Sequence, residues 1–481
     1  MKLLIRLALA AGGGYLGYAS FEPLGWWWAG ILGLALLCVS LAPWGDHEPR
    51  KRTGALLGLV YGLALYLPLL PWVGEFVGTL PWVALAVTES LYFIVFGALA
   101  IPIARWRRWG GPGLALWFVA AEYVRSNWPF GGFAWGRLAW GQIEGPLAHW
   151  ASIGGPALVT FVAVLAAALL ASRRPIQGVL ALGIILSGLL IPAGGHDVGD
   201  VKVAAIQGNV PRMGLDFNTQ RRAVLANHAR ETGEVKEPVD LVIWPENSSD
   251  VNPFADPQAR ALIEGAVVKV GAPTLVGTIT VDQVGPRNTM VVFNPDGSTG
   301  EYHHKKFLQP FGEYMPYRDF FRKFSEFVDQ AGNFQPGTGN GVVTMGDVKV
   351  GIATCYEVAF DAAARTAVDN GAQILTTPTN NATFGFTDMT YQQMAMSRLR
   401  AIETDRAVVI AATSGSSALI RPDGSIISQT KIFQPAVLQD TLPLRDTKTL
   451  AVRYGTYLEL ALASFGAVCA LLAFLRSRRA G

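Results

Sequence analysis

The sequence predicts a polytopic α-helical membrane domain joined to one α/β domain. Of the 481 residues, 51% are hydrophobic and only 16% are charged, which is too apolar for a typical soluble protein of this size. Long apolar runs fill residues 3–193 and recur near the end, whereas residues 199–446 alternate short β-like runs with helical stretches. The formal net charge of +3 is small and the basic residues are scattered, so we expect no nucleic-acid partner.

Eight apolar runs approach the roughly 20 residues with which a helix crosses a bilayer. The first run follows Lys2 and Arg6, as in a signal peptide, but the further runs favour a retained helix. We therefore expect eight transmembrane helices. The runs lie at about 3–20, 26–43, 54–72, 80–104, 112–128, 150–172, 176–193 and 454–475.

Basic residues precede the first run, follow the second, fourth and sixth, and close the chain after the eighth. Because Lys and Arg are retained in the cytoplasm, all five clusters predict cytoplasmic termini and an α/β domain on the opposite face. We expect residues 1–195 to form a seven-helix region, 196–447 the extracytoplasmic domain, and 448–481 the last helix and tail. The clusters are Lys2 and Arg6, Arg50–Arg52, Arg105–Arg108, Arg173–Arg174 and Arg476–Arg479.

Charged residues also occur inside the apolar runs. Glu89 would cost roughly 2.5–3.5 kcal/mol at a helix centre facing lipid, so we expect it to face protein or the outer interface. A structural hydrogen bond is the preferred role for its carboxylate. Glu122 and Arg125 lie three residues apart and are expected to pair on one helix face.

Cysteine usage singles out one position. Cys38 and Cys469 lie in apolar runs, which leaves Cys355 alone in the polar region and allows no disulfide framework. Cys355 ends the apolar strand GIATC (351–355), where a turn can expose a sulfur and aim backbone N–H groups at an oxyanion. A lone cysteine at a strand end is more often a small core residue, so other residues must indicate whether Cys355 is reactive.

Two residues favour a reactive cysteine. Glu246 ends another apolar strand, LVIWPE (241–246), and in a parallel sheet would lie at the same edge as Cys355, where it can take the thiol proton. Lys305 follows a hairpin and offers an ammonium to the thiolate and to a tetrahedral oxyanion. Because a free thiol with a pKa of about 8.5 is mostly protonated at pH 7, we expect this ammonium to lower the pKa of Cys355.

Glu246, Lys305 and Cys355, in this order at strand ends and a hairpin, resemble the catalytic triad of the nitrilase superfamily. The strings WPEN (244–247), LQPFGEYMP (308–316), TCYE (354–357) and RSNWPFGGFAWG (125–136) are similar to those of its apolipoprotein N-acyltransferase family. Lys305 stands three residues before Leu308, the spacing of that family, and is therefore favoured over Lys306. The resemblance implies an αββα sandwich for the α/β domain.

The resemblance also implies a two-step acyl transfer in a bacterial cytoplasmic membrane, as the last step of lipoprotein maturation. Cys355 would attack the sn-1 ester of a phospholipid, with Glu246 as general base and Lys305 as oxyanion stabiliser. The N-terminal amine of a diacylglyceryl-modified apolipoprotein would then take the acyl chain from the thioester. Neither a cofactor nor a metal is expected, and the protein is expected to be a monomer. Supporting roles fall on Glu313, Tyr356, whose N–H would join the oxyanion hole, and Glu357.

Some positions depart from the family. Asn381 and Thr383, within TNNATFG (379–385), replace the usual aspartate and tryptophan, and Leu215 stands where a tryptophan is common. We expect these residues to line the substrate mouth, together with Phe384 and with Phe320 and Phe321 of the segment 317–334. That segment is either a helix packed on its own domain or, as we favour, an arm that touches the membrane or covers the site.

Two other functions use the same residues. A membrane-anchored amidase or nitrilase would release the thioester with water, but one span would suffice to anchor it. A scaffold or transporter would leave the domain without catalysis, against which the presence of Glu246, Lys305 and Cys355 argues. Ammonia release from small amides would identify the first, and full cellular function of Cys355→Ala the second.

Overall fold

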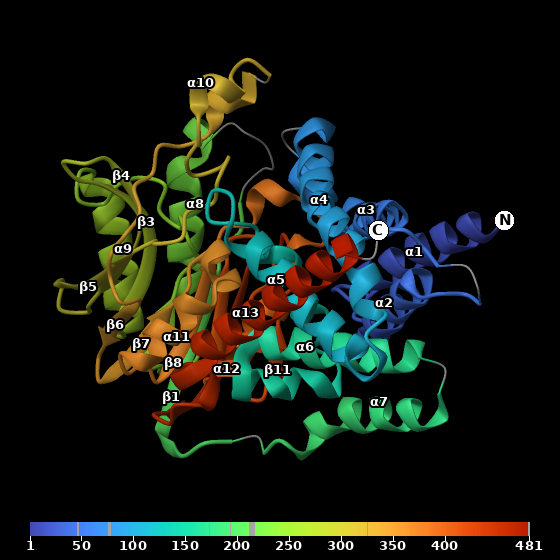
Figure 1. The fold of residues 1–481 in the computed structure, drawn as a ribbon. Helices are drawn as coiled ribbons and strands as arrows, with labels where there is room; N and C mark the ends of the chain where they lie inside the picture. The colour runs from blue at the N-terminus through green and yellow to red at the C-terminus, as the bar shows by residue number, and fades with distance from the viewer. Residues whose placement is uncertain are drawn as a thin grey trace. The chain divides into compact units, whose positions relative to one another are not determined.

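The computed structural model describes residues 1–45, 48–75, 78–172, 174–192, 194–210, 217–324 and 326–479. The chain divides into two compact units. Met1–Pro192 together with Arg453–Gly481 form one, called here the helical unit, and Ala193–Val452 form the other, called the α/β unit. In Figure 1 the helices of the helical unit run from blue to green and end with α13 in red.

The apolar runs of the helical unit form helices, whose backbone groups are satisfied within each segment, as a lipid environment requires. Within the described ranges, four stretches are long and apolar enough to span a membrane: Lys51–Leu69, Thr79–Ala104, Pro146–Ala171 and Leu450–Ser477. The predicted count of eight spans stays a prediction. The helices are α1 (Lys2–Ala19), α2 (Trp27–Leu41), α3 (Lys51–Leu69), α4 (Thr79–Ala104), α5 (Gly110–Asn127), α6 (Ala151–Ala171), α7 (Pro175–Ser187) and α13 (Leu450–Arg479).

Small residues let α3 and α4 approach closely. A Cβ added at Gly58 would lie 1.9 Å from the carbonyl oxygen of Phe93, and one at Gly97 would lie 2.1 Å from that of Gly54. Larger side chains there would force the backbones apart, and close backbone approach is how apolar helices associate in lipid.

Buried ion pairs join the helices of this unit. Arg125 donates to Glu89 at 2.8 Å, and both side chains are buried. The expected pair between Glu122 and Arg125 is wrong, because Glu122 instead accepts from the backbone of Leu138 and from Thr160, each at 2.8 Å. The preferred role for Glu89, a structural contact with protein, agrees with this geometry.

The α/β unit contains two sheets. Counted over its described residues, each has six strands, in the orders β12-β1-β2-β3-β4-β5 and β11-β10-β9-β8-β7-β6. The turns NPDG (294–297) and RPDG (421–424) each close an antiparallel hairpin, β4–β5 and β10–β11. The strands are β1 (Asp197–Gln207), β2 (Leu241–Ile243), β3 (Thr274–Val281), β4 (Pro286–Phe293), β5 (Thr299–His304), β6 (Val342–Met345), β7 (Val348–Ile352), β8 (Ile374–Thr379), β9 (Val408–Ala412), β10 (Ala418–Ile420), β11 (Ile426–Gln429) and β12 (Ala436–Arg445).

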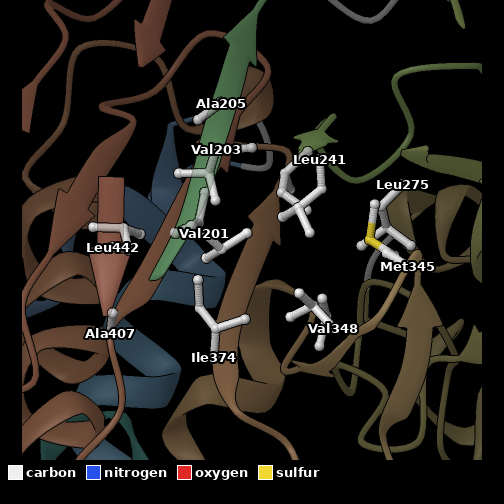
Figure 2. Packing of buried hydrophobic residues seen from close by; sticks show 14 of the residues in the cluster. Val201, Val203, Ala205, Leu241, Leu275, Met345, Val348, Ile374, Ala407 and Leu442 are labelled. Carbon is white, nitrogen blue, oxygen red and sulfur yellow. The ribbon is translucent and has the colours of Figure 1, made fainter. Parts of the chain in front are cut away.

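The two sheets pack face to face and helices cover their outer faces. Figure 2 shows side chains of one sheet, such as Val203 and Leu241, facing Val348 and Ile374 of the other. A second cluster joins the first sheet to α9, and a third joins the second sheet to α11 and α12. The expected α/β sandwich is confirmed, with helices α8 (Phe217–Thr232) and α9 (Pro257–Val270) on one side and α11 (Asp361–Asp369) and α12 (Met389–Thr404) on the other.

Candidate active site

The candidate site lies where parallel strands of both sheets end. β1, β2 and β3 are parallel in the first sheet, and β7, β8 and β9 are parallel in the second. Glu246 follows β2 and Cys355 follows β7. The backbone N–H of Asn380, just after β8, donates to Glu246 at 3.0 Å, so the carboxyl ends of β2 and β8 meet.

Glu246 is surrounded by hydrogen-bond donors. Its Oε1 accepts from Lys305 Nζ at 2.8 Å and from Asn288 Nδ2 at 2.7 Å, while Oε2 accepts from Asn380. The backbone carbonyl of Glu246 accepts from the hydroxyl of Thr413 at 3.3 Å. The carboxylate is therefore held in one orientation by Asn288 of β4, by Lys305 after β5 and by the backbone after β8, while Thr413 holds the backbone of Glu246.

Lys305 lies between two carboxylates. Its Nζ is 2.8 Å from Glu246 and 3.0 Å from Glu313, and the side chain is buried. Burial alone would lower the pKa of Lys305, but the charges of Glu246 and Glu313 outweigh it and hold that pKa well above its ordinary value. Lys305 is therefore an ammonium. Glu313, fixed by the N–H of Gln309 at 2.8 Å, has a raised pKa because it is buried and close to Glu246.

Cys355 begins a short helical turn, Cys355–Ala359, with φ at +50°. Only a small part of this residue, 5%, is exposed. The expectation of a lowered thiol pKa is wrong: burial, followed by the charge of Glu246, raises the pKa of Cys355 to about 12, and the opposing effect of Lys305 is smaller. At rest the sulfur is a neutral thiol, and a base must remove its proton during the reaction.

Glu357 ties the turn of Cys355 to the loop that carries Lys305. One carboxylate oxygen accepts from the N–H groups of Lys306 and Phe307 at 2.7 and 3.1 Å, and the other from that of Thr354 at 2.8 Å. His303 Nε2 lies 3.3 Å from the second oxygen. Burial raises the pKa of Glu357, but His303 and these N–H groups outweigh it and hold the pKa below its ordinary value. Glu357 therefore positions the two loops as a buried anion.

Two amides at the site were missed by the sequence analysis. Asn288 on β4 donates through Nδ2 to Glu246 and to Glu313, the latter at 2.9 Å. Gln393 on α12 places Nε2 3.5 Å from the sulfur of Cys355. Neither belongs to a recognisable motif, and a polar residue inside a strand or helix signals burial at a site only once its neighbours are known.

The expected substrate mouth is only partly assembled. Asn381 is buried in a hydrogen-bond network, whereas Thr383 and Phe384 are half-buried. Leu215 lies outside the described residues. Among its described residues, 317–324 and 326–334, the segment 317–334 forms the short helix α10 (Arg318–Phe321) and a turn at Glu326–Gln330. Phe320 is 55% exposed and contacts Phe321 edge to face. The helix α10 lies at one end of the α/β unit (Figure 1).

Tyr356, expected to support the oxyanion, is buried beside the nucleophile. Its ring contacts Phe360 edge to face with centroids 5.2 Å apart, and Phe360 stacks on Phe307 at 4.7 Å. These contacts pack the turn of Cys355 against the loop after Lys305, and the role of the Tyr356 N–H stays a prediction.

Comparisons with known proteins cover both units. Residues 13–169 match the family model "Apolipoprotein N-acyltransferase N-terminal domain", and residues 202–451 match "Carbon-nitrogen hydrolase". The apolipoprotein N-acyltransferase of Mycolicibacterium smegmatis is 44% identical over 98% of this chain and 86% of its own length. Proteins of that name from Geobacter metallireducens and Ralstonia nicotianae are 30% and 31% identical over 93% and 100% of this chain, and over 91% and 95% of their own lengths.

Proposed function

The chain belongs to the apolipoprotein N-acyltransferase family, and on that premise we propose that Cys355 carries an acyl chain from a phospholipid to the N-terminal amine of a diacylglyceryl-cysteine apolipoprotein. The observation that carries this proposal is the buried cluster of Glu246, Lys305 and Glu313, whose charges act on the free thiol of Cys355. Buried charges of this kind are expensive to maintain, and they concentrate where a reaction uses them.

In the first half-reaction Cys355 attacks the ester carbonyl of the phospholipid. Because the resting thiol is neutral, its proton passes to Glu246 as the bond from sulfur to carbon forms. The ester carbon–oxygen bond then breaks, the lysophospholipid leaves with the proton from Glu246, and an acyl thioester remains. Lys305, which stays an ammonium, stabilises the negative charge on the carbonyl oxygen in the tetrahedral intermediate.

In the second half-reaction the amine of the apolipoprotein attacks the thioester. Glu246 takes a proton from the attacking nitrogen, the new amide bond forms, and the carbon–sulfur bond breaks. The sulfur leaves as a thiolate and recovers the proton from Glu246. Glu313 and Asn288 hold the carboxylate and Lys305 in place through both steps.

The membrane domain suits two lipid substrates. Drawing a sixteen-carbon chain into water would cost on the order of ten kcal/mol or more, at ~0.8 kcal/mol for each CH₂.

We assign eight spans, with residues 1–195 and 448–481 in the membrane domain, residues 196–447 as the catalytic domain on its outer face, both termini in the cytoplasm and a monomeric enzyme. The segment 317–334 serves as an arm at the lipid surface. A fluorescent protein that folds only in the cytoplasm, fused after Gly481, should fluoresce, and a dark fusion would contradict this orientation.

Intact-mass measurement tests the reaction. Purified protein incubated with phospholipid vesicles should gain one acyl mass, release lysophospholipid and lose the mass in hydroxylamine. The variant Cys355→Ala should show no gain. The matched control replaces the two other cysteines, Cys38 and Cys469, by Ser and should be acylated as the natural chain is. Acylation that persists in Cys355→Ala, or no acylation in the control, would overturn the proposal.

A further inference from the structure

The side chain of Gln393 faces the sulfur of the nucleophile. Gln393 belongs to α12 and is almost completely buried. Its Nε2 lies 3.5 Å from Cys355 Sγ, and hydrogen bonds to sulfur are long because sulfur is a large atom. The amide is therefore an N–H donor to the reacting atom itself.

Two neighbours fix which way this amide points. The hydroxyl of Thr379 donates its one proton to the closer acceptor, Asn381 Oδ1 at 2.7 Å, so the Nδ2 of Asn381 faces Gln393 Oε1 at 3.3 Å. Asn381 Nδ2 is also 3.0 Å from the hydroxyl oxygen of Thr390, which accepts the N–H of Ser416. Because the N–H of Asn381 faces the oxygen of Gln393, the NH₂ group of Gln393 is the part that faces the sulfur.

We infer that Gln393 is a further catalytic residue, which stabilises the thiolate of Cys355 by donating an N–H to it. The expected effect on acylation rests on the proposed function, whereas the contact between Gln393 and Cys355 does not. Negative charge develops on the sulfur twice in the cycle, when Glu246 takes the proton during the attack and when the carbon–sulfur bond of the thioester breaks. A hydrogen bond to a buried charge is stronger than one to a neutral thiol, so this contact favours the charged form at both moments.

Asn381 acts as a positioning residue through Gln393. An aspartate at this position would have no N–H, and its carboxylate would face the carbonyl oxygen of Gln393. The amide of Gln393 would then be free to turn its oxygen towards the sulfur, which would repel a thiolate. The asparagine at 381 thus fits a site in which a glutamine serves the cysteine.

The test uses the full-length enzyme and two readouts. Gln393→Met keeps the size of the side chain and removes the donor, so the acylation rate with phospholipid vesicles should fall roughly ten- to a hundredfold. The rate of alkylation by iodoacetamide should also fall across pH 8–10, because a higher thiol pKa leaves less thiolate. Asn381→Asp should shift both readouts in the same direction by less.

The matched control is Gln392→Met, the same change on the neighbouring buried glutamine of α12, whose side chain leaves the helix about 100° away. It should leave both rates unchanged. The inference would be overturned if Gln393→Met kept its melting temperature and was alkylated and acylated at the rates of the natural enzyme. If Gln393→Met fails to fold, the test uses Gln393→Glu, which places a carboxylate at the sulfur. This variant must be alkylated more slowly than the natural enzyme, or the inference fails. Alkylation by iodoacetamide needs no lipid. If Cys355 of the natural enzyme is alkylated but is never acylated by phospholipid, only the proposed function is contradicted.

Discussion

The buried ion pairs of the helical unit and the buried ion pair of the candidate site use different cations. In the helical unit the cations are Arg125 and Arg137, which bind Glu89 and Glu459 at 2.8 Å each. At the candidate site of the α/β unit the cation is Lys305, shared by Glu246 and Glu313, whereas Arg365 and Arg400 form the buried pairs with Glu403 elsewhere in that unit. A guanidinium holds its protons at any working pH and binds carboxylates in a fixed geometry, whereas a lysine ammonium is a compact charge that can serve a changing partner.

The difference teaches how the same interaction serves structure or reaction. The Arg125 pair joins α5 to α4 and the Arg137 pair joins the segment after α5 to α13, and Arg125 also donates to the backbone oxygen of Phe133 at 2.9 Å. The lysine pair lies beside a thiol whose charge state must change. If both members of a structural pair are replaced by neutral side chains, stability should be largely retained. If both members of a reactive pair are replaced, the reaction should be lost, and double variants can test this difference.

The largest effect is expected from Glu246→Gln. The amide keeps the size of the carboxylate but cannot take the thiol proton, so the acylation rate should fall about 10²- to 10⁴-fold. Adding Lys305→Met removes the remaining cation of the pair and should not restore the rate. Single-turnover acylation by intact mass checks both variants, and recovery in the double variant would mean that the pair is structural.

In the helical unit the opposite result is expected. Arg125→Met leaves Glu89 buried without its cation and should destabilise the unit by about 3–5 kcal/mol. Glu89→Gln combined with Arg125→Met should recover most of this loss, because no uncompensated charge remains. Thermal unfolding in detergent measures the stability. Acylation per folded molecule should stay unchanged in both variants, and a double variant as unstable as the single one would remove the contrast between the units.

The sequence predicts the two sheets and the strand ends of the site well, since an apolar run followed by Glu246 or Cys355 is a local signal. The spacing before Leu308 also predicts which lysine is buried. Long-range contacts escape such reasoning. Glu89 and Arg125 pair across two helices rather than along one, and Asn288 and Gln393 come from the middle of a strand and a helix.

The direction of the thiol pKa could not be predicted from residue types either. The sequence shows that a lysine is available, but whether it outweighs burial and the charge of Glu246 depends on the folded geometry. The structure has both carboxylates in contact with the ammonium, so much of its charge is already balanced before the sulfur is considered.

The titration of Cys355 should sharpen this point. With a pKa of about 12, raised by burial and Glu246, roughly one thiol in ten thousand is ionised at pH 8. Alkylation by iodoacetamide should therefore rise about tenfold with each pH unit up to about pH 12. Glu246→Gln removes a negative charge, lowers the pKa of Cys355 and should speed alkylation at pH 8–9 while it slows acylation. Slower alkylation in this variant would show that Glu246 does not raise the pKa of the thiol.

A glycine in each unit provides a smaller, parallel test. A Cβ at Gly277 would lie 2.2 Å from the carbonyl oxygen of Pro245 and 2.8 Å from Glu246 Cα, whereas one at Gly58 would press on Phe93. Either change to Ala should cost about 1–3 kcal/mol of stability. Only Gly277→Ala should also slow acylation, on the order of tenfold, because it displaces the base. Equal loss of acylation rate per folded molecule in both would mean that the rate simply follows stability.

The smallest effect is expected at Lys306, the neighbour of the buried lysine. Its side chain is exposed, and the contact that its backbone N–H makes with Glu357 is retained by any residue except proline. Lys306→Met should therefore change stability by less than about 0.5 kcal/mol and leave the acylation rate within about twofold. Lys305→Met, the same substitution one residue earlier, removes the ammonium from between two carboxylates and should nearly abolish acylation. Because the two variants lose the same charge, only the position of the ammonium can explain a difference between them, and similar acylation rates would mean that net charge near the site, rather than contact with Glu246, supports the reaction.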